Sequence, residues 1–362
     1  MDSSYVVVPA LIVLVGALIA WLSARRILLL RRKNYPMWRK TTECIVLLPI
    51  ALLAVAVAGN SGLDARAFLG SGPPGAMYLV DGHKMRIECT GSGSPTIVLD
   101  AGLGNDGLIW GGIQPVLAKT TRICSYDRAG FGWSDPLPFP RYADRIAEEL
   151  HGLLTAAQIE GPIVLMGHSI AGLYIRDYAG RYPASVAGLI FVDGSVPLPS
   201  VNRVVPRIDA REASPRIETL LEQAAFHLGL PRLLGACPGS FPGFGHRAAI
   251  PRIEGLCHEH FDAYASEWEN FDRSNIEAAK SGSYGALPIL IFSRDTADRV
   301  WNQGQEELKK LSTCSRRIIA RDSTHYIQLD RSELVEREAS LFIEQIRGKA
   351  PAPIDYQSTT TK

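Results

Sequence analysis

The chain has 362 residues, a formal net charge of +1 at pH 7 and 21% charged residues. This length accommodates one large folded domain together with an additional segment. The near-neutral charge argues against both a nucleic-acid-binding protein and a highly charged disordered chain, so we expect no nucleic-acid partner. The positive charge is nevertheless concentrated, because a dense group of Arg and Lys residues lies within residues 25–40.

Two apolar segments flank this basic stretch. Residues 5–24 contain no charged residue and are long enough to cross the apolar core of a bilayer, which needs about 20 residues. A signal peptide is the alternative for this segment, but Asp2 gives it an acidic rather than a basic start. Residues 44–59 are shorter and contain Pro49, so they form either a second membrane-spanning helix or a buried helix.

The basic residues between the two segments predict the orientation of the chain. Loops rich in Arg and Lys stay in the cytoplasm, so two membrane-spanning helices would place both chain ends on the other side. We therefore expect a multi-pass protein of the plasma (inner) membrane whose globular domain is extracytoplasmic. The lipid bilayer is then a partner of the N-terminal helices.

Composition divides the chain into four parts. Residues 1–62 form the predicted membrane anchor with its two helices. Residues 63–75 are rich in Gly, Pro and Ala and are predicted to be a linker. Residues 76–348 form the predicted globular domain, and residues 349–362 a C-terminal tail.

Short apolar runs alternate with amphipathic stretches along the globular domain. Residues 77–80 and 84–89 flank an Asp-Gly pair, which is typical of a β-hairpin. Residues 142–159 carry apolar side chains at helical spacing. Further strands are predicted at residues 96–99, 122–126, 163–166, 189–192, 289–292 and 317–320. Strands that alternate with helices predict an α/β fold, with a mostly parallel sheet covered by helices on both faces.

One interval interrupts this alternation. Residues 196–284 are too many for a simple connection between two strands. We expect them to form a helical cap over the carboxyl edge of the sheet, where open α/β sheets bind ligands. The aromatic residues of this interval form either an apolar pocket or the core of the cap itself: Phe226, Phe241, Phe244, Phe261, Tyr264, Trp268 and Phe271.

Residues 167–172, Gly-His-Ser-Ile-Ala-Gly, carry the clearest chemical signal. They directly follow a predicted strand and precede a predicted helix, and a nucleophilic serine on such a sharp turn needs small neighbours. Gly167 fits this pattern, whereas Ala171 replaces the usual second glycine. A serine that merely caps a helix is the structural alternative, so the prediction that Ser169 is a nucleophile depends on the rest of the chain.

Two further segments contain groups that such a serine requires. Residues 100–104 are glycine-rich and follow a predicted strand, so their backbone N–H groups can point toward a developing oxyanion. We assign the N–H groups of Leu103 and Ile170 to that role. His325 follows the last predicted strand and is expected to reach Ser169 as the general base, whereas His168 is expected to pack within the turn.

The acid that orients His325 has two main candidates. Asp295 follows the strand predicted at residues 289–292, which is the usual place for this carboxylate, and it is the preferred candidate. Asp193 also stands at the end of a predicted strand and is the main alternative. Asp298, three residues beyond Asp295, is a further carboxylate in the same region.

Several short motifs occur in a fixed order between residues 77 and 346: VLDAGLG, YDRAGFGWSDP, GHSIAG, RYP, FVDGS and HYIQLD. With these motifs the chain resembles the α/β-hydrolase superfamily, in particular its bacterial esterase-like and lipase-like members. The resemblance implies the α/β-hydrolase fold and a reaction without a cofactor. It also implies Ser169 as nucleophile, His325 as base, and Leu103 and Ile170 as oxyanion donors.

The expected function is therefore that of a serine hydrolase. It would cleave a small-molecule carboxylic ester, apolar or lipid-like, through an acyl-enzyme. An acyltransferase or amidase would use the same catalytic residues, and a catalytically inactive membrane-anchored binding protein is the alternative from another class. Dehalogenases and epoxide hydrolases of this fold are disfavoured, because they need a carboxylate at the position of Ser169.

The cysteines allow two predicted disulfides. In the expected strand order the strands that carry Cys89 and Cys124 are neighbours, so these two residues can pair. Cys237 and Cys257 both fall in the predicted cap and can form a second bridge. The alternative is that the cysteines are small buried apolar residues, and their spacing predicts no metal site.

Overall fold

The structure is a computed structural model of the full chain that describes residues 4–70, 73–136, 140–197, 225 and 261–348. It consists of two compact units. Of the described residues, the first contains 4–70 with the N-terminal helices. The second contains 73–136, 140–197 and 262–348 with the β-sheet.

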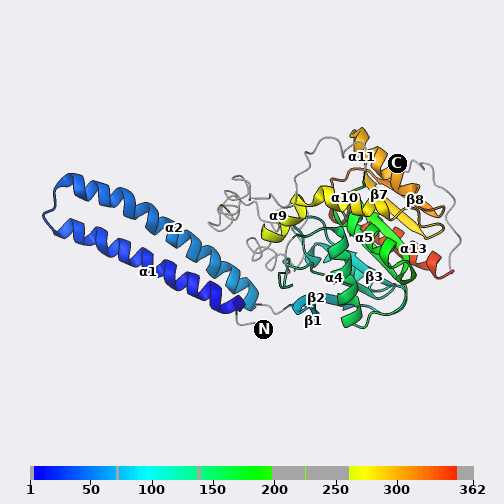
Figure 1. The fold of residues 1–362 in the computed structure, drawn as a ribbon, viewed down its shortest axis with the longest axis horizontal. Helices are drawn as coiled ribbons and strands as arrows, with labels where there is room; N and C mark the ends of the chain where they lie inside the picture. Colours follow the sequence, from blue (N-terminus) through cyan, green and yellow to red (C-terminus); the bar gives the residue numbers. More distant parts are fainter. Residues whose placement is uncertain (1–3, 71–72, 137–139, 198–224, 226–260, 349–362) are drawn as a thin grey trace. The chain divides into compact units, whose positions relative to one another are not determined.

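The N-terminal segment forms a helical hairpin, with α1 (Ser4–Arg32) and α2 (Met37–Gly70) packed side by side (Figure 1). Both helices contain stretches long and apolar enough to cross a membrane, Ala10–Arg32 and Met37–Gly59, with mean hydropathies of 2.0 and 2.2. Gly16 permits close packing, because a Cβ atom there would lie 2.8 Å from the Ala54 carbonyl oxygen. The sequence prediction of two such helices is confirmed by their length and composition.

The linker predicted at residues 63–75 begins later than expected. Residues 63–70 belong to α2, so the segment between the helix and the first strand is shorter. Composition explains the difference, since Leu63, Ala65, Arg66, Ala67 and Leu69 are strong helix formers that outweigh the nearby glycines.

An eight-stranded sheet with the strand order β1-β2-β4-β3-β5-β6-β7-β8 forms the centre of the second unit. The strands β1 and β2 are antiparallel to their neighbours, and all other pairs are parallel. This mixed, mostly parallel sheet confirms the predicted fold class. The bounds of the strands are β1 Ala76–Val80, β2 His83–Thr90, β3 Thr96–Asp100, β4 Ile123–Tyr126, β5 Ile163–His168, β6 Val186–Val192, β7 Ile289–Arg294 and β8 Ser315–Ala320.

Helices cover both faces of this sheet. Leu189 and Phe191 of β6 belong to the same apolar cluster as Leu153 of α4, whereas a Cβ atom on Gly188 would lie 3.0 Å from Phe342 of α13. Successive residues of a strand point to opposite faces, so α4 and α13 lie on different faces. The helix bounds are α3 Gln114–Leu117, α4 Ala143–Ala156, α5 Ala171–Arg181, α9 Phe261–Glu269, α10 Phe271–Lys280, α11 Arg299–Lys309, α12 Ile327–Asp330 and α13 Ser332–Ile346, with short 3-10 turns at Gly107–Trp110 and Pro183–Ser185.

A disulfide joins Cys89 of β2 to Cys124 of β4. The two residues are directly paired across these antiparallel strands, as the expected strand order predicted. Cys44 and Cys314 are free. The second predicted bridge, between Cys237 and Cys257, falls outside the described residues.

The described part of the predicted cap consists mainly of α9 and α10. The prediction of a complete helical cap over residues 196–284 extends beyond the described residues, as do the side chains of Phe226, Phe241, Phe244 and Phe261, and so does the predicted tail at residues 349–362. Both described helices belong to the same unit as the sheet from Asp262 onward. They can therefore be related directly to the residues at its carboxyl edge.

Candidate active site

Ser169 stands on a sharp turn between β5 and α5, as its motif predicted. Its φ of +55° lies in the left-handed region that non-glycine residues rarely adopt. The turn requires Gly167, because a Cβ atom there would lie 2.9 Å from the Ala171 carbonyl oxygen. Gly172 is also confined, because a Cβ atom there would lie 3.0 Å from the Gly194 Cα atom. Ala171 is thus accommodated, and Gly172 is the glycine that the tight packing requires.

His325 lies in the loop between β8 and α12, with its ring directed at Ser169. The distance from His325 Nε2 to Ser169 Oγ is 2.8 Å. A histidine protonated on Nδ1 accepts the serine hydroxyl proton through Nε2. The structure therefore brings together the serine and the histidine that sequence reasoning had paired.

Asp193 is the carboxylate beside His325. Its Oδ2 lies 2.6 Å from His325 Nδ1, and its side chain is completely buried. The residue follows β6 directly and has a φ of +45°, so the chain turns sharply at this point. The Trp301 indole N–H donates to Asp193 Oδ1 over 2.8 Å, and the Arg294 backbone N–H donates to the same oxygen over 3.1 Å.

The structure does not bring Asp295, the preferred acid in the sequence analysis, to His325. Its backbone N–H donates to the Ala320 carbonyl oxygen over 3.2 Å, so the residue continues the pairing of β7 with β8. Its side chain is exposed. Asp298 instead caps α11 by accepting from the Val300 and Trp301 N–H groups. The hydrogen bond expected from Asp295 is made by the alternative, Asp193.

The surroundings of Asp193 keep it ionised. Burial alone would raise the pKa of this carboxyl group. The hydrogen bonds from His325 and Trp301 outweigh that effect, and the resulting pKa lies below its ordinary value. The Arg294 guanidinium, 3.2 Å from Asp193 Oδ2, adds a positive charge beside it. Asp193 is therefore a negatively charged acceptor for His325 at neutral pH.

His168 packs within the turn, as predicted, and also contacts the loop of His325. Its Nε2 lies 3.0 Å from the His325 carbonyl oxygen, and its ring is almost fully buried. Burial, together with the nearby His325, lowers the pKa of His168 to about 3. The ring is thus neutral at physiological pH and can donate to the carbonyl from Nε2.

The loop that carries Leu103 lies beside the Ser169 turn. A Cβ atom on Gly102 would lie 3.3 Å from Ser169 Cβ and 2.6 Å from His168 Nδ1, so only glycine fits this close approach. The Leu103 side chain packs against the apolar cluster that contains Ile170. The two segments expected to donate to an oxyanion are therefore neighbours in the fold.

Sequence reasoning missed three buried or partly buried side chains around this site. Trp301, on α11, holds Asp193, while Arg128 and Glu267 form an ion pair beside the Gly102 loop. Arg128 belongs to the YDRAGFGWSDP motif, which was a usable signal. No sequence signal distinguishes Trp301 or Glu267, because their partners are distant in the chain.

Comparison with known proteins identifies the family of the chain. Residues 97–338 match the alpha/beta hydrolase family, so the chain belongs to that family. It is 28% identical over 295 residues to “Probable transporter efuK” of Hormonema carpetanum, an alignment that covers 71% of this chain and 40% of that protein. The chain spans only 40% to 58% of the length of this and two other curated relatives.

Solved structures share the fold at low sequence identity. A thermophilic esterase from Thermogutta terrifontis is 18% identical with a TM-score of 0.58, and the match covers 75% of this chain and 98% of that one. The epoxide hydrolase CorEH is 16% identical with a TM-score of 0.51, at 75% and 98% coverage. Because both reactions occur on this fold, these likenesses define the fold and leave the reaction to the site residues.

We predict that His168 makes the stability of the protein depend on pH. Its folded pKa of about 3 lies below the ordinary 6.5, so the unfolded state binds more protons between these values. The contribution of His168 to the free energy of unfolding therefore decreases as the pH falls from about 6.5 toward 3, by ~1.4 kcal/mol per pH unit. The free energy of unfolding is measured with urea for the wild type and for His168→Gln at several pH values. It should decrease less steeply with falling pH in the variant. Equal slopes would contradict the assignment of a neutral buried His168.

Proposed function

We propose that the chain is a serine hydrolase that cleaves carboxylic esters through an acyl-enzyme. The observation that carries this proposal is the continuous series of hydrogen bonds from Asp193 through His325 to Ser169, with distances of 2.6 and 2.8 Å. A serine hydroxyl is a weak nucleophile until a base accepts its proton. Here the base is already in contact with the hydroxyl group, and a buried carboxylate orients the base.

The reaction follows from the atoms in contact. Ser169 Oγ attacks the ester carbonyl carbon while its proton passes to His325 Nε2, and Asp193 stabilises the resulting imidazolium. The backbone N–H groups of Leu103 and Ile170 stabilise the oxyanion. His325 then gives the proton to the departing alcohol, which leaves an acyl group on Ser169. A water molecule, deprotonated by His325, releases the acid and restores Ser169.

The residue at the nucleophile position separates this proposal from other reactions of the fold. An epoxide hydrolase or dehalogenase forms its covalent intermediate on a carboxylate, and this chain has Ser169 there. Acyl transfer and amide cleavage use the same three residues, so the acceptor and leaving group distinguish them. We propose an apolar or lipid-like ester as the substrate, since the N-terminal helices are suited to hold the chain at a bilayer.

Ser169→Ala tests the proposed nucleophile. We expect the purified full-length wild type to hydrolyse p-nitrophenyl acyl esters and to be labelled by a fluorophosphonate probe. The variant should not be labelled, and its kcat should be at least about a thousandfold lower, because the three residues act as a unit. Ser185→Ala removes a hydroxyl group that donates to the Tyr182 carbonyl oxygen; it serves as control and should match the wild type. A folded wild type that is neither labelled nor active would support the inactive binding protein instead.

We further propose that the sheet-containing unit lies outside the cytoplasm, anchored in the plasma (inner) membrane. The residues that join α1 to α2 lie among the Arg and Lys residues of the 25–40 stretch, which favours a cytoplasmic turn. The Cys89–Cys124 disulfide also supports an oxidising compartment for the folded domain.

Reporter fusions test this orientation. We expect a reporter that is active only in the cytoplasm to give no signal when fused after Lys362. The same reporter inserted after Asn34, in the turn between α1 and α2, should give strong signal. Strong signal from the Lys362 fusion, with none from the Asn34 insertion, would refute the proposed orientation.

A further inference from the structure

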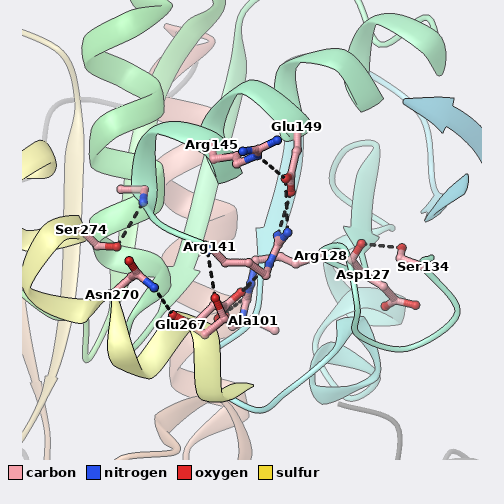
Figure 2. Close-up of polar contacts among 12 residues, drawn as sticks. Ala101, Asp127, Arg128, Ser134, Arg141, Arg145, Glu149, Glu267, Asn270 and Ser274 are labelled. Carbon is pink, nitrogen blue, oxygen red and sulfur yellow. Dashed lines mark hydrogen bonds and ion pairs between the residues drawn. The ribbon is translucent and has the colours of Figure 1, made fainter. Parts of the chain in front are cut away.

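Arg128 is a buried cation beside the proposed oxyanion loop, and Figure 2 shows it between Ala101 of that loop and Glu267. It lies just after β4, and every N–H of its guanidinium group has an acceptor. Two bonds of 2.8 Å go to the carboxylate of Glu267, which belongs to α9. The others go to Asp100 Oδ1 and to the backbone carbonyl oxygens of Ala101 and Gly102, over 2.9, 2.5 and 3.0 Å.

Glu267 is the partner that secures this charge. Burial disfavours the charged form of Arg128, but the carboxylates of Glu267 and Asp100 hold its pKa above the ordinary value. Burial raises the pKa of Asp100 itself to about 6. Glu267 is fully buried and makes a bidentate pair with Arg128, and such pairs fix orientation as well as charge.

The two carbonyl contacts determine the direction of the neighbouring N–H groups. A trans peptide unit is planar, and its C=O and N–H groups point in opposite directions. The unit that presents the Gly102 oxygen to Arg128 also carries the N–H of Leu103. Arg128 and the Asn105 backbone N–H, 3.2 Å away, both donate to that oxygen, so the Leu103 N–H must point away from Arg128. The backbone at Gly102 lies close to Ser169, as the 3.3 Å approach of a built Cβ atom demonstrates.

We propose that Arg128, held by Glu267, is a positioning residue that aims the Leu103 N–H at the oxyanion formed on the substrate. The inference rests on the proposed serine hydrolase function, which gives that N–H its task. Preorganised donors stabilise a transition state because they need no reorganisation when charge develops. A guanidinium bonded to two consecutive carbonyl groups provides such preorganisation for a glycine-containing loop.

This arrangement also connects the described cap helices with the oxyanion loop. Glu267 belongs to α9, and the Oγ atom of the neighbouring Ser266 accepts a hydrogen bond from the Arg141 backbone N–H over 3.0 Å. Ser274 of α10 accepts one from the Ala143 N–H over 3.1 Å. Arg141 Nε also lies 3.7 Å from Glu267 Oε1, but these two hydrogen bonds join α9 and α10 to residues 141–143 without the Glu267 carboxylate. Removal of that charge should therefore affect the loop without releasing the helices.

The experiment compares two buried ion pairs that differ in what they hold. Glu267→Gln removes the charge that secures Arg128. Arg128→Lys keeps the positive charge but offers three donors from one nitrogen in place of the five bonds that the guanidinium makes to Glu267, Asp100 and the two carbonyl groups. Glu149→Gln is the matched control. Glu149 is also buried and makes a pair of hydrogen bonds with an arginine, Arg141, over 2.7 and 3.2 Å. Because Arg141 lies 3.7 Å from Glu267, this control removes a charge from the same group of buried side chains without removing a partner of Arg128.

Each full-length variant is purified in detergent, and its thermal unfolding midpoint is measured by circular dichroism. Activity is then assayed at a temperature well below that midpoint. We expect Glu267→Gln and Arg128→Lys to lower kcat about tenfold to a hundredfold with little change in KM, which is part of the loss for a missing oxyanion donor. The Ki of a trifluoromethyl ketone, which forms an oxyanion on the serine, should rise by the same factor. Glu149→Gln should lower the stability of the protein but leave kcat and Ki unchanged.

Two results would overturn the inference while leaving the proposed function intact. One is an active wild type in which Glu267→Gln and Arg128→Lys keep the kcat and Ki of Glu149→Gln. The other is a rise in KM with unchanged kcat, which would place Arg128 in substrate binding instead. A wild type without fluorophosphonate labelling would instead refute the proposed function, so the two failures are distinguishable.

Discussion

The hydrogen bond between Asp193 and His325 is the interaction on which the proposed active site depends. It spans 2.6 Å and joins the end of β6 to the loop after β8, residues that lie 132 positions apart in the chain. Because the sheet places β5, β6, β7 and β8 next to one another, the ends of three strands can bring Ser169, Asp193 and His325 into one line. The parallel sheet supplies the alignment, and sharp backbone turns at Ser169 and Asp193 supply the final directions.

Two sets of polar side chains support the active site. Arg294 and Trp301 hold Asp193, while Arg128 and Glu267 hold the backbone at Gly102. Both sets remove charged groups from water, which is costly unless every group is paired. The fold accepts that cost next to the proposed nucleophile, where fixed dipoles have the greatest effect on a developing charge. The buried charges are thus more readily explained by precise positioning than by stability.

The sequence predicted much of this arrangement for identifiable physical reasons. Ser169 was predictable because its glycine-flanked turn is a local sequence signal. His325 was predictable because it follows the last predicted strand. The acid was not, because the choice depends on the turn after β6 and on the use of the Asp295 N–H in pairing β7 with β8. The Arg128–Glu267 pair was also beyond prediction, since its members are separated by 139 positions and only folding brings them together.

The most direct test of this account compares two carboxylates in the same enzyme. Loss of the correct acid leaves the histidine in the wrong tautomer and lowers kcat by about ten thousandfold in a well-studied serine protease. The account predicts a loss approaching that size for Asp193→Asn in ester hydrolysis, with the fold retained, and activity within about threefold of wild type for Asp295→Asn. A severe loss in Asp295→Asn beside a nearly active Asp193→Asn would contradict it.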